Sequence, residues 1–80
     1  MVEDAIIRAF EIYKLVKKPM VNFIDDEVLF EWHDENLIAL LVKPDKYILS
    51  SVGHGNFLYQ FTSKEWTLEQ LGVMGLIQQL

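Results

Sequence analysis

The sequence predicts an α+β fold: a four-stranded antiparallel meander sheet flanked by an N-terminal and a C-terminal helix, in the order αββββα. Apolar residues recur at helical spacing near both ends of the chain, and between them four segments are patterned as strands. The connections between these segments are short, which favours antiparallel hairpins. The chain has 80 residues, enough for one hydrophobic core, so residues 1–80 are expected to form a single domain.

The first helix is predicted over Glu3 to Lys18, with Pro19 ending it. Its helical stripe consists of Ala5, Ile6, Ala9, Phe10, Tyr13 and Val16. Ile7, Ile12 and Leu15 lie outside this stripe, so the apolar surface is broader than one packing face needs. We expect this helix either to be covered on two sides or to use its second stripe as a contact surface.

The middle of the chain predicts four strands. Residues 20–24 are expected to form an extended connector, and the first strand runs from Glu27 to Trp32 with alternate residues on opposite faces. The next segment is apolar on both faces, as in a central strand. Turns are expected at Pro44-Asp45-Lys46 and at Gly53–Asn56. The remaining predicted strands are Leu37 to Lys43, Tyr47 to Val52 and Phe57 to Phe61.

The last segment is predicted as a helix, and two starts compete. The capping-box spacing is met by Thr67 with Gln70 and by Thr62 with Glu65. Gly72 and Gly75 fall inside this predicted helix, where each costs about 1 kcal/mol unless the missing side chain permits a close approach. Both helices are expected to cover the same face of the sheet.

The composition excludes several classes of function. Twelve acidic and seven basic residues give a net charge of −5, which argues against direct nucleic-acid binding. The absence of cysteine excludes disulfides and thiolate metal sites. Because the first residues lack a signal-peptide pattern and no apolar run reaches the roughly 18 residues of a membrane span, we expect a cytoplasmic protein.

Three short polar clusters are candidates for chemistry. His33-Asp34-Glu35-Asn36 carries donors suited to a metal ion, but four consecutive residues between two strands favour a hairpin turn. Asp25-Asp26-Glu27 and Gly53-His54-Gly55 also favour turns. We therefore expect a non-enzyme without catalytic, metal or cofactor-binding residues. The alternative is a metal- or carboxylate-dependent hydrolase that uses Asp25, Asp26, His33 and His54.

The first half of the chain follows a definite order: a helix, Pro19, Asp25-Asp26, Val28-Leu29-Phe30-Glu31-Trp32, Leu37 to Val42, and Asp45-Lys46-Tyr47. This order resembles a class of short uncharacterised bacterial and phage proteins with a helix, a proline, an Asp-Gly turn, a strand ending in Glu-Trp, and a hairpin leading to an Asp-Gly-x-Tyr turn. The resemblance covers residues 19 to 47, and Asp26 and Lys46 stand where that pattern favours glycine. It implies no activity for any residue.

We expect the protein to be a small non-catalytic interaction module. Hydrophobic residues make up 51% of the chain, more than so small a body can bury, so a homodimer or a larger protein should cover the remainder. One version is a phage or mobile-element inhibitor whose acidic surface occupies a basic groove of a host factor. A self-assembling structural subunit is a further alternative. The candidate acidic rim is Asp25, Asp26, Glu31, Asp34 and Glu35, and the candidate apolar contacts are Ile7, Ile12, Leu29, Trp66, Val73 and Leu76.

Overall fold

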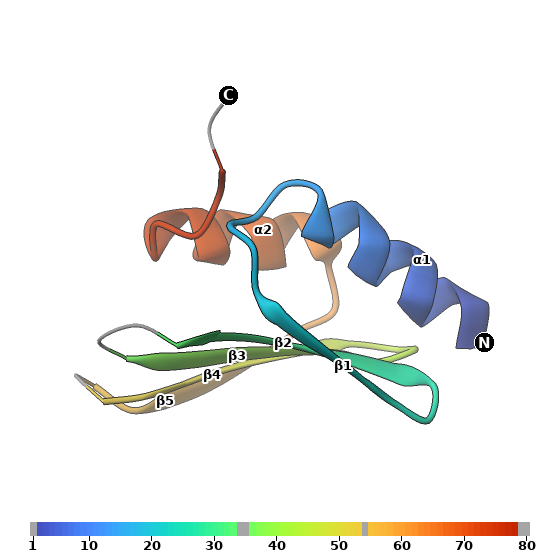
Figure 1. Cartoon of the computed structure of the whole chain (residues 1–80), viewed down its shortest axis with the longest axis horizontal. Helices are drawn as coiled ribbons and strands as arrows, with labels where there is room; N and C mark the ends of the chain where they lie inside the picture. Colours follow the sequence, from blue (N-terminus) through green and yellow to red (C-terminus); the bar gives the residue numbers. More distant parts are fainter. Residues whose placement is uncertain (1, 34–35, 54, 79–80) are drawn as a thin grey trace.

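Two helices lie on one face of a single antiparallel sheet (Figure 1). The structure is a computed structural model that describes residues 2–33, 36–53 and 55–78. The helices are α1 (Val2–Tyr13) and α2 (Lys64–Val73). The strands follow one another across the sheet in chain order: β1 (Met20–Ile24), β2 (Glu27–His33), β3 (Leu37–Val42), β4 (Tyr47–Val52) and β5 (Phe57–Phe61). The predicted α+β meander is confirmed, with the two helices at opposite ends of the chain, but the sheet has five strands and not four.

The additional strand is β1, the segment expected to be a connector. It pairs with β2 from Met20 opposite Glu31 to Ile24 opposite Glu27. The two residues between the strands make a tight turn in which Asp25 has a φ of 54°, and a positive φ at the first central residue is typical of two-residue hairpin turns. A five-residue strand with one polar residue gives a weak alternation signal, and the pairing with β2 supplies the rest of its stability.

The first helix ends at Tyr13 and not at Lys18 as predicted. After a turn, Val16 forms an isolated antiparallel bridge with Ile77 from the C-terminal segment, and main-chain hydrogen bonds join the same two segments on either side of that bridge. These bonds draw residues 16 and 17 out of the helix and into an extended path. A contact distant in sequence therefore ends α1 before the proline is reached.

The second helix begins between its two predicted starts. Ser63 is the N-cap, and its hydroxyl oxygen accepts a hydrogen bond from the Trp66 N–H at 3.3 Å. Thr67, one of the predicted caps, is fully buried and donates through Oγ1 to the Ser63 carbonyl at 2.9 Å. At the other end the helix stops before Gly75, whose φ of 76° is left-handed, so this glycine does not lie inside the helix.

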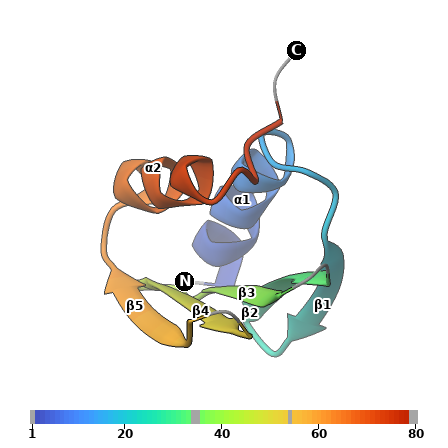
Figure 2. The same cartoon turned by 90° about the vertical axis from the view of Figure 1, so that its left-hand side faces the viewer.

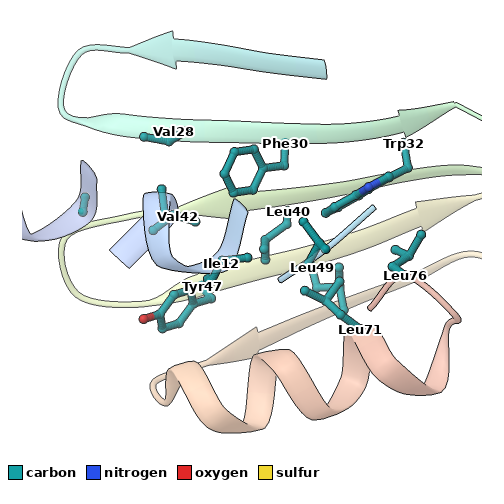
Figure 3. Packing of buried hydrophobic residues seen from close by; sticks show 13 residues of the cluster. Ile12, Val28, Phe30, Trp32, Leu40, Val42, Tyr47, Leu49, Leu71 and Leu76 are labelled. Carbon is teal, nitrogen blue, oxygen red and sulfur yellow. The ribbon is translucent and has the colours of Figure 1, made fainter. Parts of the chain in front are cut away.

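The hydrophobic core fills the space between the helices and the sheet (Figure 3). Its largest share comes from alternate residues of the three central strands, all on the face toward the helices. The Trp32 indole N–H donates to the Lys17 carbonyl at 2.7 Å, so this buried ring has a partner for its polar atom. The core residues are Ala5, Ala9, Ile12, Val16, Val28, Phe30, Trp32, Leu40, Val42, Tyr47, Leu49, Leu71 and Leu76.

The face that α1 buries differs from the predicted stripe. Ala5, Ala9 and Ile12 are buried, whereas Ile6 and Phe10, which the helical spacing placed with the alanines, are exposed. Two alanines allow the helix backbone to approach the sheet closely, because neither carries a side chain beyond Cβ. This contact orients the helix so that the larger side chains at positions 6 and 10 lie along its flank.

Candidate interaction surface

An apolar groove lies between α1 and β1. Its volume is about 290 Å³, and its base is formed by Val28 and Phe30, which are buried in the sheet. Its sides include Phe10 and Phe23, whose exposed fractions are 66% and 70%. The complete lining is Ile6, Ala9, Phe10, Tyr13, Val21, Phe23, Val28 and Phe30. All eight residues are alanine, branched aliphatic or aromatic, so the groove suits apolar side chains of a partner.

The groove exists because two helices do not cover five strands. Helix α1 packs against β2 and β3, and α2 packs against β4 and β5, which leaves β1 beyond the helix layer (Figure 2). The β1–β2 register places Val21 opposite Phe30 and Phe23 opposite Val28, so these two β1 side chains lie on the helix side of the sheet. All five β1 residues are exposed.

The outer edge of β1 presents main-chain hydrogen-bonding groups. Within the described parts of the chain, β1 pairs only with β2. In an antiparallel strand, successive residues direct their N–H and C=O groups to opposite sides. Ile24 and Glu27 flank the two-residue turn and form its closing pair, so the groups of Val21 and Phe23 point away from β2. These four groups form a template on which another strand can pair.

The face of the sheet opposite the helices is semi-apolar and carries Leu29 and Glu31 of β2. Leu29 lies opposite Leu41, and Leu41 lies opposite Ile48, so the three form a row across the central strands. Each of them is half-buried by its neighbours, and Leu58 at the β5 edge is exposed. This open face is a second apolar surface. It is flat, whereas the apolar surface between α1 and β1 is a groove.

The described residues of the predicted acidic rim lie at the two opposite ends of β2. Asp25 and Asp26 lie together at the β1–β2 turn, with Asp25 exposed. Glu31 lies opposite Met20 at the far end of the hairpin, 3.9 Å from the His33 imidazole. Asp34 and Glu35 lie outside the described residues. The two aspartates at the turn are therefore the part of the rim that the structure brings together.

The carboxylate beside that turn belongs to an ion pair. Glu27 accepts a hydrogen bond from the Lys43 ammonium at 2.7 Å. This hydrogen bond raises the pKa of Lys43 above its ordinary value, and the charges of Glu27, Asp45 and Asp26 add to the effect. Since Lys43 offsets Glu27, the remaining negative charge at this end of the sheet comes from Asp25 and Asp26 and from Asp45 in the β3–β4 turn.

The predicted apolar contacts are spread over the molecule. Ile12 and Leu76 are core residues, so neither side chain is offered to a partner. Leu29 lies half-buried on the open sheet face. Ile7, Trp66 and Val73 are exposed on the helices. These six residues do not line the groove, which is formed by a different set.

The residues of the alternative hydrolase are far apart where they are described. Asp25 and Asp26 precede β2, and His33 is its last residue, which separates them by roughly 20 Å of extended strand. His54 lies outside the described residues. Among residues 2–33, 36–53 and 55–78, no three His, Asp or Glu side chains are grouped closely enough to hold a metal ion.

A larger hollow of about 740 Å³ lies at the opposite end of β2 from the aspartate turn. Its lining combines polar and apolar side chains: Lys17, Lys18, Glu31, His33 and Asn36 with Pro19, Met20, Trp32, Ile38, Met74 and Leu76. It is open and mixed in polarity, in contrast to the apolar groove. No helix in the described part of the chain is long and apolar enough to cross a membrane.

Comparison of the chain with protein-family models, with curated proteins and with solved structures finds no match. The function therefore has to be inferred from the surfaces themselves. The groove-lining side chains Ile6, Phe10, Val21 and Phe23 were not predicted as partner contacts. The signal that could have revealed Val21 and Phe23 is an apolar segment, residues 20–24, that is separated from the strand beginning at Glu27 by only two residues, Asp25 and Asp26, as in a two-residue hairpin.

Proposed function

We propose that this protein is a small non-catalytic interaction module and that β1 is its binding element. An extended segment of another polypeptide pairs with the outer edge of β1, and alternate side chains of that segment fill the groove beside α1. This mode of recognition is strand addition: main-chain hydrogen bonds supply affinity, and side-chain pockets supply specificity. The observation that supports it is an exposed apolar edge strand directly beside an apolar groove.

The composition of β1 distinguishes it from a protected sheet edge. Proteins commonly block an exposed edge with lysine, proline or an inward-pointing charge. Between Met20 and Ile24, the only polar side chain is that of Asn22, and it carries no charge. An edge without such protection is suited to pairing with another strand.

The opposite edge strand, β5, is also uncharged but lacks the groove. Its rings pack against one another: Phe57 and Tyr59 are stacked with centroids 4.8 Å apart, and Tyr59 lies 6.2 Å from Phe61. These contacts fill the helix side of β5 with side chains of the same strand. The β5 edge therefore provides the natural control surface for tests of β1.

Selection of short extended peptides tests this function directly. We expect peptides of about ten residues, selected from a random library on the wild-type protein, to carry apolar residues at alternate positions. Phe23→Asp should weaken their binding about tenfold or more, because a charge then lies in the groove. Leu58→Asp, at an equally exposed site on β5, should leave binding unchanged. Equal effects of the two substitutions, or no enriched peptide on a chain that stays monomeric, would show that β1 is not the binding element.

A further inference from the structure

Strand β1 is self-complementary about its central residue. Met20 and Val21 precede Asn22, and Phe23 and Ile24 follow it. When two copies of the strand run antiparallel about a two-fold axis at Asn22, Val21 lies opposite Phe23 of the second copy, and Met20 lies opposite Ile24. The first of these apolar pairs is on the helix side of the sheet and the second is on the open side.

The main chain permits this register and disfavours the neighbouring ones. Only Val21 and Phe23 direct their N–H and C=O groups outward, so these residues must face each other across the axis. An axis at Asn22 pairs both of them. An axis at Val21 would place Phe23 opposite Pro19, which has no N–H. An axis at Phe23 would place Val21 opposite Asp25, whose φ of 54° belongs to the turn.

The same register brings opposite charges together. In this register the segment before β1 of each copy, which carries Lys17 and Lys18, lies beside the β1–β2 turn of the other copy, which carries Asp25 and Asp26. Lys17, Lys18 and Asp25 are exposed. Each end of the paired strands therefore joins a basic and an acidic group, although each chain carries a net charge of −5. A two-fold axis repeats this pairing at both ends.

The apolar surface around β1 includes side chains on both faces of the strand. Its exposed side chains are Ile6, Phe10, Met20, Val21, Phe23 and Ile24. Pairing would cover the members of this set that line the groove, among them Phe10 and Phe23, which are about two thirds exposed, whereas Met20 and Ile24 stay on the open face. Pairing of the strands would also join the two grooves into one apolar layer, closed on its sides by the α1 helices.

We propose, building on the function proposed above, that the segment that binds β1 is β1 of a second copy, paired antiparallel about a two-fold axis at Asn22. The dimer then has one continuous sheet that passes through both copies, and the two Asn22 side chains meet on its open face. Self-pairing uses the exposed edge, the groove and the two charged ends of β1 at the same time.

A single engineered cysteine tests the register. The chain contains no cysteine, so Asn22→Cys introduces one thiol in each copy. Asn22 and its symmetry mate form a non-hydrogen-bonded pair with Cα atoms about 4.5 Å apart, within the range of about 4.4–6.8 Å that a disulfide spans. We expect oxidation of the Asn22→Cys variant to give a covalent dimer about tenfold faster than oxidation of Gln60→Cys. Gln60 is an exposed residue of β5 on the open face of the sheet, the face that also carries Asn22. Equal rates would overturn the proposed register.

Sedimentation equilibrium, from low micromolar to several hundred micromolar protein, tests the association itself. We expect the wild-type chain to dimerise, Phe23→Asp to weaken the dimer about tenfold or more, and Leu58→Asp to have no effect. Both substituted sites are exposed, and circular dichroism checks that the variants fold. A wild-type chain that is monomeric throughout, or a dimer sensitive to Leu58→Asp in place of Phe23→Asp, would overturn the inference.

The peptide selection separates this inference from the proposed function. A monomeric chain that still binds the selected peptides in a Phe23-dependent manner overturns self-pairing and leaves strand addition to β1 intact. A chain that neither dimerises nor binds peptides through β1 overturns both.

Discussion

Gly72 and Gly75 are close in sequence but occupy different conformations. Gly75 has a φ of 76° directly after α2. Its N–H donates to the Gly72 carbonyl at 3.0 Å, and the Leu76 N–H donates to the Leu71 carbonyl at 2.9 Å, the hydrogen-bond pattern of a Schellman motif. Gly72 lies in the helix, where an added Cβ would be 3.5 Å from Ile77 Cγ1, an ordinary van der Waals contact.

Alanine substitutions at the two glycines should therefore change stability in opposite directions. Gly75→Ala forces a Cβ into the left-handed region and should lower the free energy of unfolding by about 1–2 kcal/mol. Gly72→Ala gains helix propensity and should raise it by about 0.5–1 kcal/mol. Urea denaturation of both variants against the wild type measures the difference. A shift of the same sign for both would contradict the helix end described above.

At the scale of the element, Ser63 and Glu65 stabilise the start of α2. The Ser63 hydroxyl accepts from the Trp66 N–H at 3.3 Å and lies 3.1 Å from Glu65 Oε2, to which it donates. The hydrogen bond from its own main-chain N–H, followed by that from Ser63, holds the pKa of the Glu65 carboxyl below its ordinary value. An ionised carboxylate in the first turn also interacts favourably with the helix dipole.

This lowered pKa predicts a pH-dependent contribution to stability. Because the folded state binds the Glu65 proton less readily than the unfolded state, the stabilisation is present above the ordinary pKa of glutamate and is lost as pH falls through the folded value. Glu65→Gln should therefore be less stable than the wild type near neutral pH, and the difference should shrink toward about pH 3. Urea denaturation at both pH values measures it, with Glu69→Gln on the same helix as the control for net charge. If the difference in stability between the wild type and Glu65→Gln did not depend on pH, the ionised Glu65 carboxylate would not stabilise the start of α2.

The elements that sequence alone predicted well are those with local signals. The strands Tyr47–Val52 and Phe57–Phe61 have the predicted bounds. The signals that define them, alternating side chains and flanking turn residues, lie within a few positions of each strand. The early end of α1 and the pairing of β1 depend on segments elsewhere, namely residues 76–78 and strand β2. No window of neighbouring residues contains that information.

The candidate site was less predictable than the fold for the same reason. Whether Phe10 or Ile12 faces the sheet depends on the rotation of α1, which is determined by the close approach of Ala5 and Ala9. A helix that is apolar on a broad surface permits more than one such rotation. Phe23 becomes part of a groove only when β1 extends the sheet past the helix layer.

At the scale of the whole molecule, the described part of the sheet keeps an apolar surface on each of its sides after folding. The groove beside β1 and the open sheet face lie on opposite sides of one sheet. A domain of this size buries only about 60–65% of the surface that its unfolded chain exposes, so two short helices leave part of a five-stranded sheet uncovered. Pairing through β1 would cover the groove and leave the open faces of both copies side by side, available to a further partner.

The charged ends of β1 give the last prediction, which concerns the assembly as a whole. In the proposed register, the segment that carries Lys18 in each copy lies beside the turn that carries Asp26 in the other. Lys18→Asp alone places two acidic groups at each end of the paired strands, and Asp26→Lys alone places two basic groups there. Each variant should therefore dimerise several-fold more weakly than the wild type, since an exposed pair of charges contributes about 0.2–1 kcal/mol and the axis repeats it.

A mixture of the two variants should associate better than either variant alone. In a heterodimer of Lys18→Asp with Asp26→Lys, an acidic group faces a basic group at both ends of the paired strands, so attraction replaces repulsion at both contacts. Sedimentation equilibrium of each variant and of the equimolar mixture, at the same total concentration and low salt, measures the recovery. Added salt should reduce the difference. If both variants dimerise as strongly as the wild type, and mixing changes nothing, the two ends do not face each other and the axis does not pass through Asn22.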